Sequence, residues 1–271
     1  RENDSSDFFK DVFCCSDGKI LVCNLHRRSI QQLVIQDGVT QLVDIVGDID
    51  CPLVGVLNTP SPRDGNQDDA RFVRPNAMCE VCDGSILVSD FLVHRESYIC
   101  SIIRRIVFTP NGCEVSTICG KIPDYNLPDL PDDYFVKEDC IGQEASLVGI
   151  TSMTPTLDGG IMICDIRNIV FRIQIVEGGE EPVGFCRLVV GNYNGNKGFK
   201  NSNNGDIGLL SIGLKKNGIT CCPDGSFILC DEGNMAIRRI FPSEITFERG
   251  VSLPTDERRG GAGVSGTSTR C

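Results

Sequence analysis

The chain has no tryptophan, only two histidines, and no apolar run near the length that crosses a bilayer. A spanning helix needs about 20 apolar residues, so no membrane span is expected in this sequence. The scarcity of histidine limits imidazole-based metal and acid–base sites to His26 and His94. No nucleophile elbow, phosphate loop or dinucleotide-binding glycine motif is found. None of these signatures therefore supports an enzyme.

Basic residues are also in the minority, with 26 Lys and Arg against 37 Asp and Glu, for a net charge of -11. This balance opposes binding to a phosphate backbone, so nucleic acid is not an expected partner. A surface of this sign instead favours solubility and basic protein partners. With 271 residues, 41% of them hydrophobic, the chain can bury the core of one large or two small domains.

Cysteine, in contrast, is abundant, and its count of 16 is even. Only Cys79 and Cys82 have the spacing of a zinc-binding pair, and no second pair completes such a site. Disulfides, and hence an extracellular or secretory compartment, are the favoured explanation, with buried thiols packed between sheets as the alternative. The candidates are Cys14, Cys15, Cys23, Cys51, Cys79, Cys82, Cys100, Cys113, Cys119, Cys140, Cys164, Cys186, Cys221, Cys222, Cys230 and Cys271.

A repeated phrase organises the chain. An Asp-Gly pair leads into four or five mostly apolar residues and closes on Asp or Asn seven positions later. The four copies run from Asp17 to Asn24, Asp83 to Asp90, Asp158 to Asp165 and Asp224 to Asp231. Asp-Gly supplies the positive φ of a tight turn, and apolar runs this continuous predict strands covered on both faces.

Further strands are expected after each hairpin. Third strands follow in "SIQQLVI", "SIIRRIVF", "NIVFRIQI" and "NMAIRRIF", and fourth strands ending in Gly are expected in "QLVDIVG", "EVSTICG" and "CRLVVG". The copies are spaced by 66, 75 and 66 residues, with no amphipathic helix between them. Four short antiparallel strands repeated in this way predict the blades of an all-β propeller.

The pattern resembles the NHL repeat, in which a Gly-ended strand precedes Asp-Gly, Ala-x-Phe-x-x-Pro, the hairpin and an Ile-Arg strand. The second copy carries the most of it, with Gly47, Asp64, Gly65, Ala70, Phe72, Pro75, "DGSILVSD" and "IRRI" from Ile103. The resemblance implies an NHL-like β-propeller. Two departures are longer blades, with the excess in polar loops, and four copies where the family has five or six. We therefore expect an incomplete or open propeller, either an arc of a longer one or part of an assembly that completes the ring, in preference to a small closed ring of four blades.

The interpretation as a four-blade propeller divides the chain into segments. Residues 1–7 are expected to form a mobile N-terminus that carries Asn3, a candidate glycosylation site in Asn3-Asp4-Ser5. Four blades are expected at about 8–47, 48–120, 121–191 and 192–250, followed by a polar Gly/Ser/Thr-rich tail at 251–271. Any leader peptide or membrane anchor is expected to lie outside this sequence.

The recurring acids that close the hairpins are interpreted as structural. Asp90, Asp165 and Asp231 are expected to accept backbone N–H groups and to face Arg104, Arg172 and Arg238 of the next strand. Asn24 replaces the acid in the first copy, which fits a turn role better than catalysis.

Two other candidate sites are weaker. The loop from Asp64 alternates oxygens at Asp64, Asn66 and Asp68 as calcium loops do, but it lacks the glycine and glutamate of an EF-hand. His26 and His94 follow hairpin strands and are expected to be exposed loop residues. No metal and no cofactor is therefore expected.

The leading functional hypothesis is an extracellular, disulfide-stabilised propeller that binds a protein partner or assembles with itself. The alternative is a metal-dependent propeller hydrolase or lyase that uses Asp90, Asp165 and Asp231, and enzymatic activity is the less favoured of the two.

Overall fold

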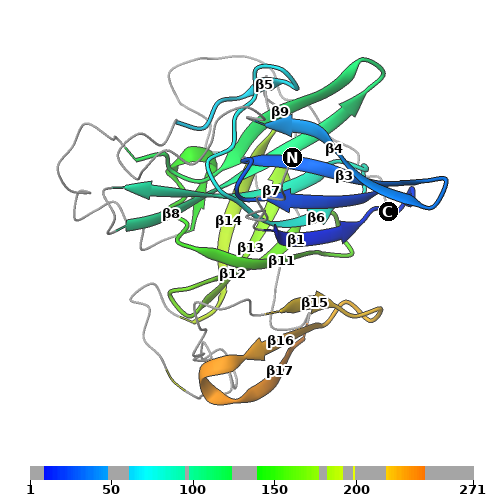
Figure 1. The fold of residues 1–271 in the computed structure, drawn as a ribbon. Coiled ribbons are helices and arrows are strands. Elements are labelled where there is room, and N and C mark those ends of the chain that lie inside the picture. Colours follow the sequence, from blue (N-terminus) through cyan, green and yellow to red (C-terminus); the bar gives the residue numbers. More distant parts are fainter. Residues whose placement is uncertain are drawn as a thin grey trace, which may run out of the picture.

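The structure is a computed structural model in which nearly all described residues with regular structure lie in β-strands (Figure 1). The structure describes residues 9–47, 61–94, 98–123, 139–176, 182–191, 198 and 218–241. Outside these ranges lie Asn3, Cys51, Cys271, the N-terminal segment 1–7 and the tail 251–271. Within them, no helix has the length and hydropathy of a membrane span.

Four antiparallel sheets are arranged as the blades of a β-propeller, one for each copy of the repeat. Blade 1 pairs β1 (Phe9–Cys14), β2 (Ile20–Asn24), β3 (Ser29–Gln36) and β4 (Val39–Gly47) in chain order. Blade 2 pairs β6 (Pro75–Glu80), β7 (Ile86–His94), β8 (Tyr98–Thr109) and β9 (Gly112–Cys119), and the short β5 (Gly65–Asn66) extends its outer edge.

Blade 3 repeats this five-stranded order, and blade 4 has three strands in its described part. Blade 3 contains β11 (Ile150–Pro155), β12 (Ile161–Asp165), β13 (Ile169–Val176) and β14 (Val183–Val190), with β10 (Cys140–Ile141) at its edge. Blade 4 contains β15 (Ile219–Cys221), β16 (Phe227–Asp231) and β17 (Ala236–Ile240). Short 3₁₀ turns lie at Gly142–Glu144 and Glu232–Asn234. Blade 1 thus has the expected four strands, and blades 2 and 3 each add a two-residue edge strand to the expected four.

The first strands of neighbouring blades pack against one another, β1 on β6, β6 on β11 and β11 on β15. Hydrogen bonds join them: Met78 N–H to Asp11 Oδ2 (2.9 Å), Asn76 Nδ2 to the Ile150 carbonyl (2.9 Å), and Ile219 N–H to Ser152 Oγ (3.2 Å). Packing of similar extent between β15 and β1 is absent from the described residues. The blades therefore form an arc with two ends, blue and orange in Figure 1.

Strand alternation decides which neighbour each hairpin residue contacts. Residues three and five positions after the turn aspartate face the preceding blade, as Ile86 and Val88 pack with Leu21 of blade 1. Residues four and six positions after it face the next blade, as Met162 and Cys164 pack with blade 4. In the two central blades all four positions are fully buried. This explains the continuous apolar runs, since a central blade has both faces covered.

The glycines that end the fourth strands are required by a close backbone approach. Gly47, Gly120 and Gly191 all have positive φ, between 97° and 127°. A Cβ at Gly47 would lie 2.4 Å from the Arg28 carbonyl oxygen, and the corresponding contacts at Gly120 and Gly191 are 2.6 and 2.3 Å. Only glycine fits there without strain, because L side chains avoid this backbone region and have no room.

Candidate functional site

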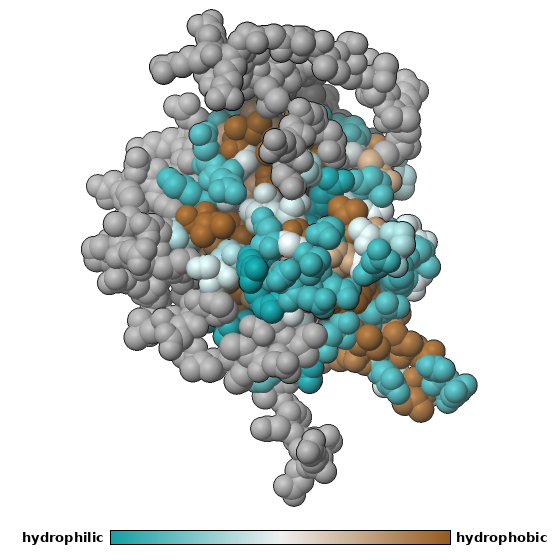
Figure 2. Space-filling view, turned by 90° about the horizontal axis from the view of Figure 1, so that it is seen from above, coloured by the Kyte–Doolittle hydropathy of each residue, from teal (hydrophilic) through white to brown (hydrophobic). Residues whose placement is uncertain are grey.

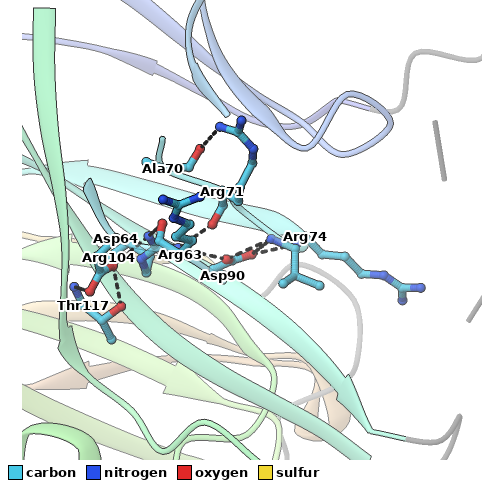
Figure 3. A network of polar contacts seen from close by, with 9 residues as sticks. Arg63, Asp64, Ala70, Arg71, Arg74, Asp90, Arg104 and Thr117 are labelled. Atoms are coloured by element: carbon cyan, nitrogen blue, oxygen red, sulfur yellow. Dashed lines mark hydrogen bonds and ion pairs between the residues drawn. The ribbon is translucent and has the colours of Figure 1, made fainter. Parts of the chain in front are cut away.

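The acids that close the hairpins are buried within separate blades and do not converge on one site. Asp90 is fully buried and accepts hydrogen bonds from the backbone N–H groups of Val73 (3.0 Å) and Arg74 (2.6 Å). Arg104 Nη1 lies 3.5 Å from its carboxylate, as expected from the repeat (Figure 3). Asp90 thus ties the loop before β6 to the hairpin.

Arg104 is the centre of the same polar network. It is fully buried, and its Nη1 also donates to the Arg71 carbonyl at 2.9 Å. Its Nη2 donates to the Arg63 carbonyl (2.7 Å) and to Asp64 Oδ1 (2.8 Å), so that one guanidinium holds two stretches of the entering loop (Figure 3). The ring of Phe72 lies 4.9 Å from the guanidinium carbon, a cation–π distance.

Burial and hydrogen bonding act on Asp90 in opposite directions. Burial raises the pKa of the Asp90 carboxyl from 3.8 to about 6, because the charged form loses its hydration. The charge of Arg104 and the N–H groups of Val73 and Arg74 lower the pKa and so limit the rise. The result is a carboxyl that titrates close to neutral pH.

Blade 3 departs from the expected pairing. Asp165 is buried and accepts from Val148 N–H (2.8 Å), while its ion pair is with Arg167 (2.7 Å), not with Arg172. Register is the reason: Arg172 stands opposite Met162, four positions after the turn aspartate, so its side chain lies on the other face of the sheet. Phe171 holds the place that Arg104 has in blade 2. In blade 4, Asp231 pairs with Arg238 at 3.2 Å, as expected.

A second ion pair recurs in three blades and was missed from the sequence. It joins the turn aspartate to the arginine opposite the fourth residue after it, in an arrangement that fastens the turn to the third strand. The pairs are Asp83 with Arg105, Asp158 with Arg172 (2.6 Å) and Asp224 with Arg239 (2.5 Å). An arginine follows each hairpin in the sequence, so a partner for the turn aspartate could be suspected. Which hairpin residue that arginine stands opposite could not be predicted, because the turns between the second and third strands differ in length.

Blade 1 keeps the geometry of the closing acid with neutral groups. Asn24 is fully buried, its Nδ2 donates to Gln31 Oε1 (2.9 Å), and its Oδ1 accepts from Arg27 N–H (3.0 Å). Gln31 in turn donates to Asp44 at 2.7 Å. A position that is hydrogen-bonded within its own blade without carrying a charge fits a structural role better than a catalytic one.

The candidate calcium loop directs its oxygens to groups of its own chain. Asp64 accepts from Arg104 and from Thr117 N–H (2.9 Å), and Asn66 Oδ1 accepts from Asp68 N–H (2.9 Å). Across the described ranges, no group of three or more His, Cys, Asp or Glu side chains is arranged to hold a metal ion. His26 is half-buried in the turn after β2 and is less exposed than expected, and His94 is the last residue of β7 and not part of a loop.

The cysteines of the described ranges, fourteen in all, form no disulfide, which differs from the expectation. Most are buried between blades, so desolvation raises the thiol pKa, as for Cys79 and Cys164. Cys140 and Cys186 stand directly opposite one another on β10 and β14. A hydrogen bond with Cys186 lowers the pKa of the Cys140 thiol, whereas burial raises that of Cys186.

The two end faces of the arc are the surfaces that have no neighbouring blade among the described residues. On blade 1 the strand alternation directs Val12, Ile20, Leu33 and Ile35 away from blade 2, and Val12 and Ile35 are each 66% exposed. We call this the blade 1 end face. Val22, at its centre, is buried.

The opposite end has the same character. On blade 4, Ile228, Cys230 and Ile237 point away from blade 3, and Ile237 is 70% exposed. Thr220 and Arg239 add polar groups to the same side. We call these five residues the blade 4 end face. Val12 and Ile237 stand at register positions whose counterparts in the central blades, Met78 and Ile103 in blade 2, are buried.

Apolar side chains also extend along the β3–β4 hairpin. Val39 and Val43 lie on the face of blade 1 that is turned towards blade 2, but near the hairpin tip, where they are 55% and 48% exposed. Figure 2 shows hydrophobic and hydrophilic residues side by side on an arm that projects from one side of the molecule, the side to which this hairpin reaches in Figure 1.

Comparison with solved structures gives similarity of fold. An auxiliary nutrient binding protein from Bacteroides thetaiotaomicron has a TM-score of 0.50 and 14% identity, over 83% of this chain and 46% of that one. A virginiamycin B lyase from Staphylococcus aureus has a TM-score of 0.43 and 13% identity, over 94% of this chain and 59% of that one. A gluconolactonase from Xanthomonas campestris has a TM-score of 0.42 and 13% identity, over 83% of this chain and 57% of that one. It thus spans about half the length of these structures.

No family model matches the sequence, and no curated protein is significantly similar to it. The all-β propeller architecture therefore stands on the arrangement of the four sheets and on structural likeness, and not on sequence relatives.

Proposed function

We propose that this chain is a binding or assembly propeller that engages a protein partner through its end faces. One observation carries the proposal: apolar residues at positions that are buried in the central blades are exposed at both ends of the arc. A contiguous exposed apolar surface of this kind is typical of a protein interaction site.

We also propose that the blades are of the NHL type. The repeated Asp-Gly turn, the strand-ending glycine and the arginine of the third strand each have a structural use in more than one blade. Gly47, Gly120 and Gly191 accept the close approach of a carbonyl, and the turn aspartates pair with arginines. A repeat whose fixed residues hold the blade together fits a scaffold that presents loops and faces.

The compartment belongs to the same proposal: the chain works outside the cell or in the secretory pathway. Its support is the count of 16 cysteines and the sequon at Asn3. Directly opposed residues on antiparallel strands have Cα atoms about 4.5–5.5 Å apart, within the range a disulfide spans. Cys140 and Cys186 meet this condition. Peptide mapping of the secreted protein without reductant should find them joined, and full alkylation of both thiols would contradict this placement.

We assign none of the closing acids to a metal. Asp90, Asp165 and Asp231 lie in different blades, and each is engaged by an arginine of its own blade. A metal-dependent hydrolase or lyase would need ligands that converge. Elemental analysis of freshly purified protein tests that alternative, because a stoichiometric divalent ion would favour it over the binding role.

Site-specific photo-crosslinking tests the binding role. A benzophenone amino acid at position 35 places the probe on the blade 1 end face, and position 114 on the exposed outer side of β9 serves as control. We expect one partner to be crosslinked from position 35 only, and purified partner to lose its affinity for Ile35→Asp. Equal crosslinking from both positions, or unchanged affinity, would contradict the proposal.

A further inference from the structure

The exposed end faces are the two halves of one kind of interface. At each junction within the chain, residues four and six positions after the turn aspartate of one blade pack on residues three and five of the next. Blade 4 presents the first half, with Ile228 and Cys230 at those positions. Blade 1 presents the second half, with Ile20 and Val22. One chain therefore carries both sides of a junction that its described residues do not form with one another.

The burial pattern marks three of these four positions as incompletely covered: Ile20 and Ile228 are half-buried and Cys230 is exposed, whereas Val22 is already buried. In blades 2 and 3 the four hairpin positions are 0% exposed, including Leu87 and Met162. In blade 4, Phe227 and Leu229 face blade 3 and are buried, whereas Ile228 is half-buried and Cys230 exposed. The difference follows from the missing neighbour and not from residue type, since all four runs are apolar.

We propose that a second copy of this chain supplies the missing neighbour, the blade 4 end face of each copy packing on the blade 1 end face of the other. This inference rests on the proposed assembly function and names its partner. Two four-blade arcs joined in this way close into a ring of eight blades, within the range that propellers adopt. The junction then forms twice under two-fold symmetry, which buries twice the area of an open head-to-tail contact and leaves no end exposed.

The β3–β4 hairpin adds to the fit. In the central blades, the third strand continues the apolar row that the preceding blade covers, as Ile106 does in blade 2. The corresponding residues of blade 1 are Leu33 and Ile35, and Ile35 is exposed. A blade from a second copy that packs on blade 1 would contact this row and bury Leu33 and Ile35.

Single variants and their mixture test the geometry. Sedimentation velocity from about 1 to 100 μM should show a species of twice the 29.5 kDa chain mass. Val12→Asp on the blade 1 end face and Ile237→Asp on the blade 4 end face should each raise the dissociation constant at least about tenfold, because a charge would be buried without a partner. Val107→Asp, at a 37% exposed site on blade 2, is the matched control and should leave the dimer unchanged.

The mixture decides the orientation. Each variant alone breaks both junctions of its ring. A mixture of Val12→Asp and Ile237→Asp retains one intact junction, and should regain a two-chain species. Loss of association in only one variant would indicate a contact between like faces and overturn the head-to-tail ring. Species larger than two chains would overturn closure.

The results of the two experiments distinguish failure of the two-chain ring from failure of the proposed binding role. A chain that stays monomeric at 100 μM while position 35 crosslinks to a different protein refutes the ring and supports the binding role. A chain that is dimeric by the predicted junctions and crosslinks to itself from position 35 supports both. A monomer without position-dependent crosslinks refutes both.

Discussion

Replacing Arg104 with alanine tests whether the blade 2 network holds the propeller together. The guanidinium is fully buried and serves four acceptors: the carboxylates of Asp90 and Asp64 and the carbonyls of Arg63 and Arg71. Alanine removes all four contacts at once and leaves the buried Asp90 charge with backbone N–H groups only.

The magnitude follows from that geometry. Breaking a buried ion pair by removing one partner costs about 3–5 kcal/mol, and each unsatisfied buried acceptor about 1–3 kcal/mol. Relaxation and water entry offset part of this sum, so we expect Arg104→Ala to lower the free energy of unfolding by about 3–5 kcal/mol. That is a large fraction of the roughly 5–15 kcal/mol that a domain possesses.

Arg105 provides a matched control on the same strand. Its side chain is 12% exposed, points to the opposite face, and pairs with Asp83, whose side chain is 44% exposed. A pair with a half-exposed carboxylate contributes about 1 kcal/mol or less, and the hydrogen bond from Arg105 Nε to Ser85 Oγ (3.0 Å) about as much, so Arg105→Ala should cost about 1–2 kcal/mol. Arg104→Lys, which keeps the charge but loses the fork, should fall between the two.

Urea unfolding followed by far-UV circular dichroism measures all three variants, since the chain has no tryptophan to report. If Arg104→Ala and Arg105→Ala differ by less than about 1 kcal/mol, the argument that burial makes the first network decisive is wrong. Should Arg104→Ala fail to fold, the ordering of Arg104→Lys against Arg105→Ala still decides the question.

Two further predictions follow from the same structure. The Asp90 carboxyl, raised by burial, should titrate at about pH 6 by ¹³C NMR. Since its folded pKa exceeds the unfolded value of about 3.9, its contribution to stability should be full below pH 4 and lost as the pH rises through 6. A midpoint at or below 4 would show that the N–H groups and Arg104 outweigh burial. Gly120→Ala should destabilise by more than about 2 kcal/mol, because its Cβ would lie 2.6 Å from the Ser101 carbonyl oxygen, whereas Gly84→Ala, with nothing within 4 Å, should cost only about 1–2 kcal/mol of backbone strain. Equal losses at the two sites would refute the close-approach argument.

The sequence alone determined the local units. The Asp-Gly turns at Asp17, Asp83, Asp158 and Asp224 all connect paired strands, because turn chemistry and alternation are set by neighbours in the chain. The glycines that end the fourth strands were visible as a pattern, although their reason, a carbonyl 2.3–2.6 Å from where a Cβ would be, came from the structure.

Tertiary structure decided everything that depends on register between strands. Arg172 and Arg238 follow their hairpins at the same distance from Asn168 and Asn234, yet one pairs with a turn aspartate and the other with a closing acid. One more residue in the blade 4 turn shifts the register, and a shift of one residue moves a side chain to the opposite face. The open arc and its two end faces are likewise invisible in a single repeat, because whether a blade is covered depends on neighbours that its own residues do not specify.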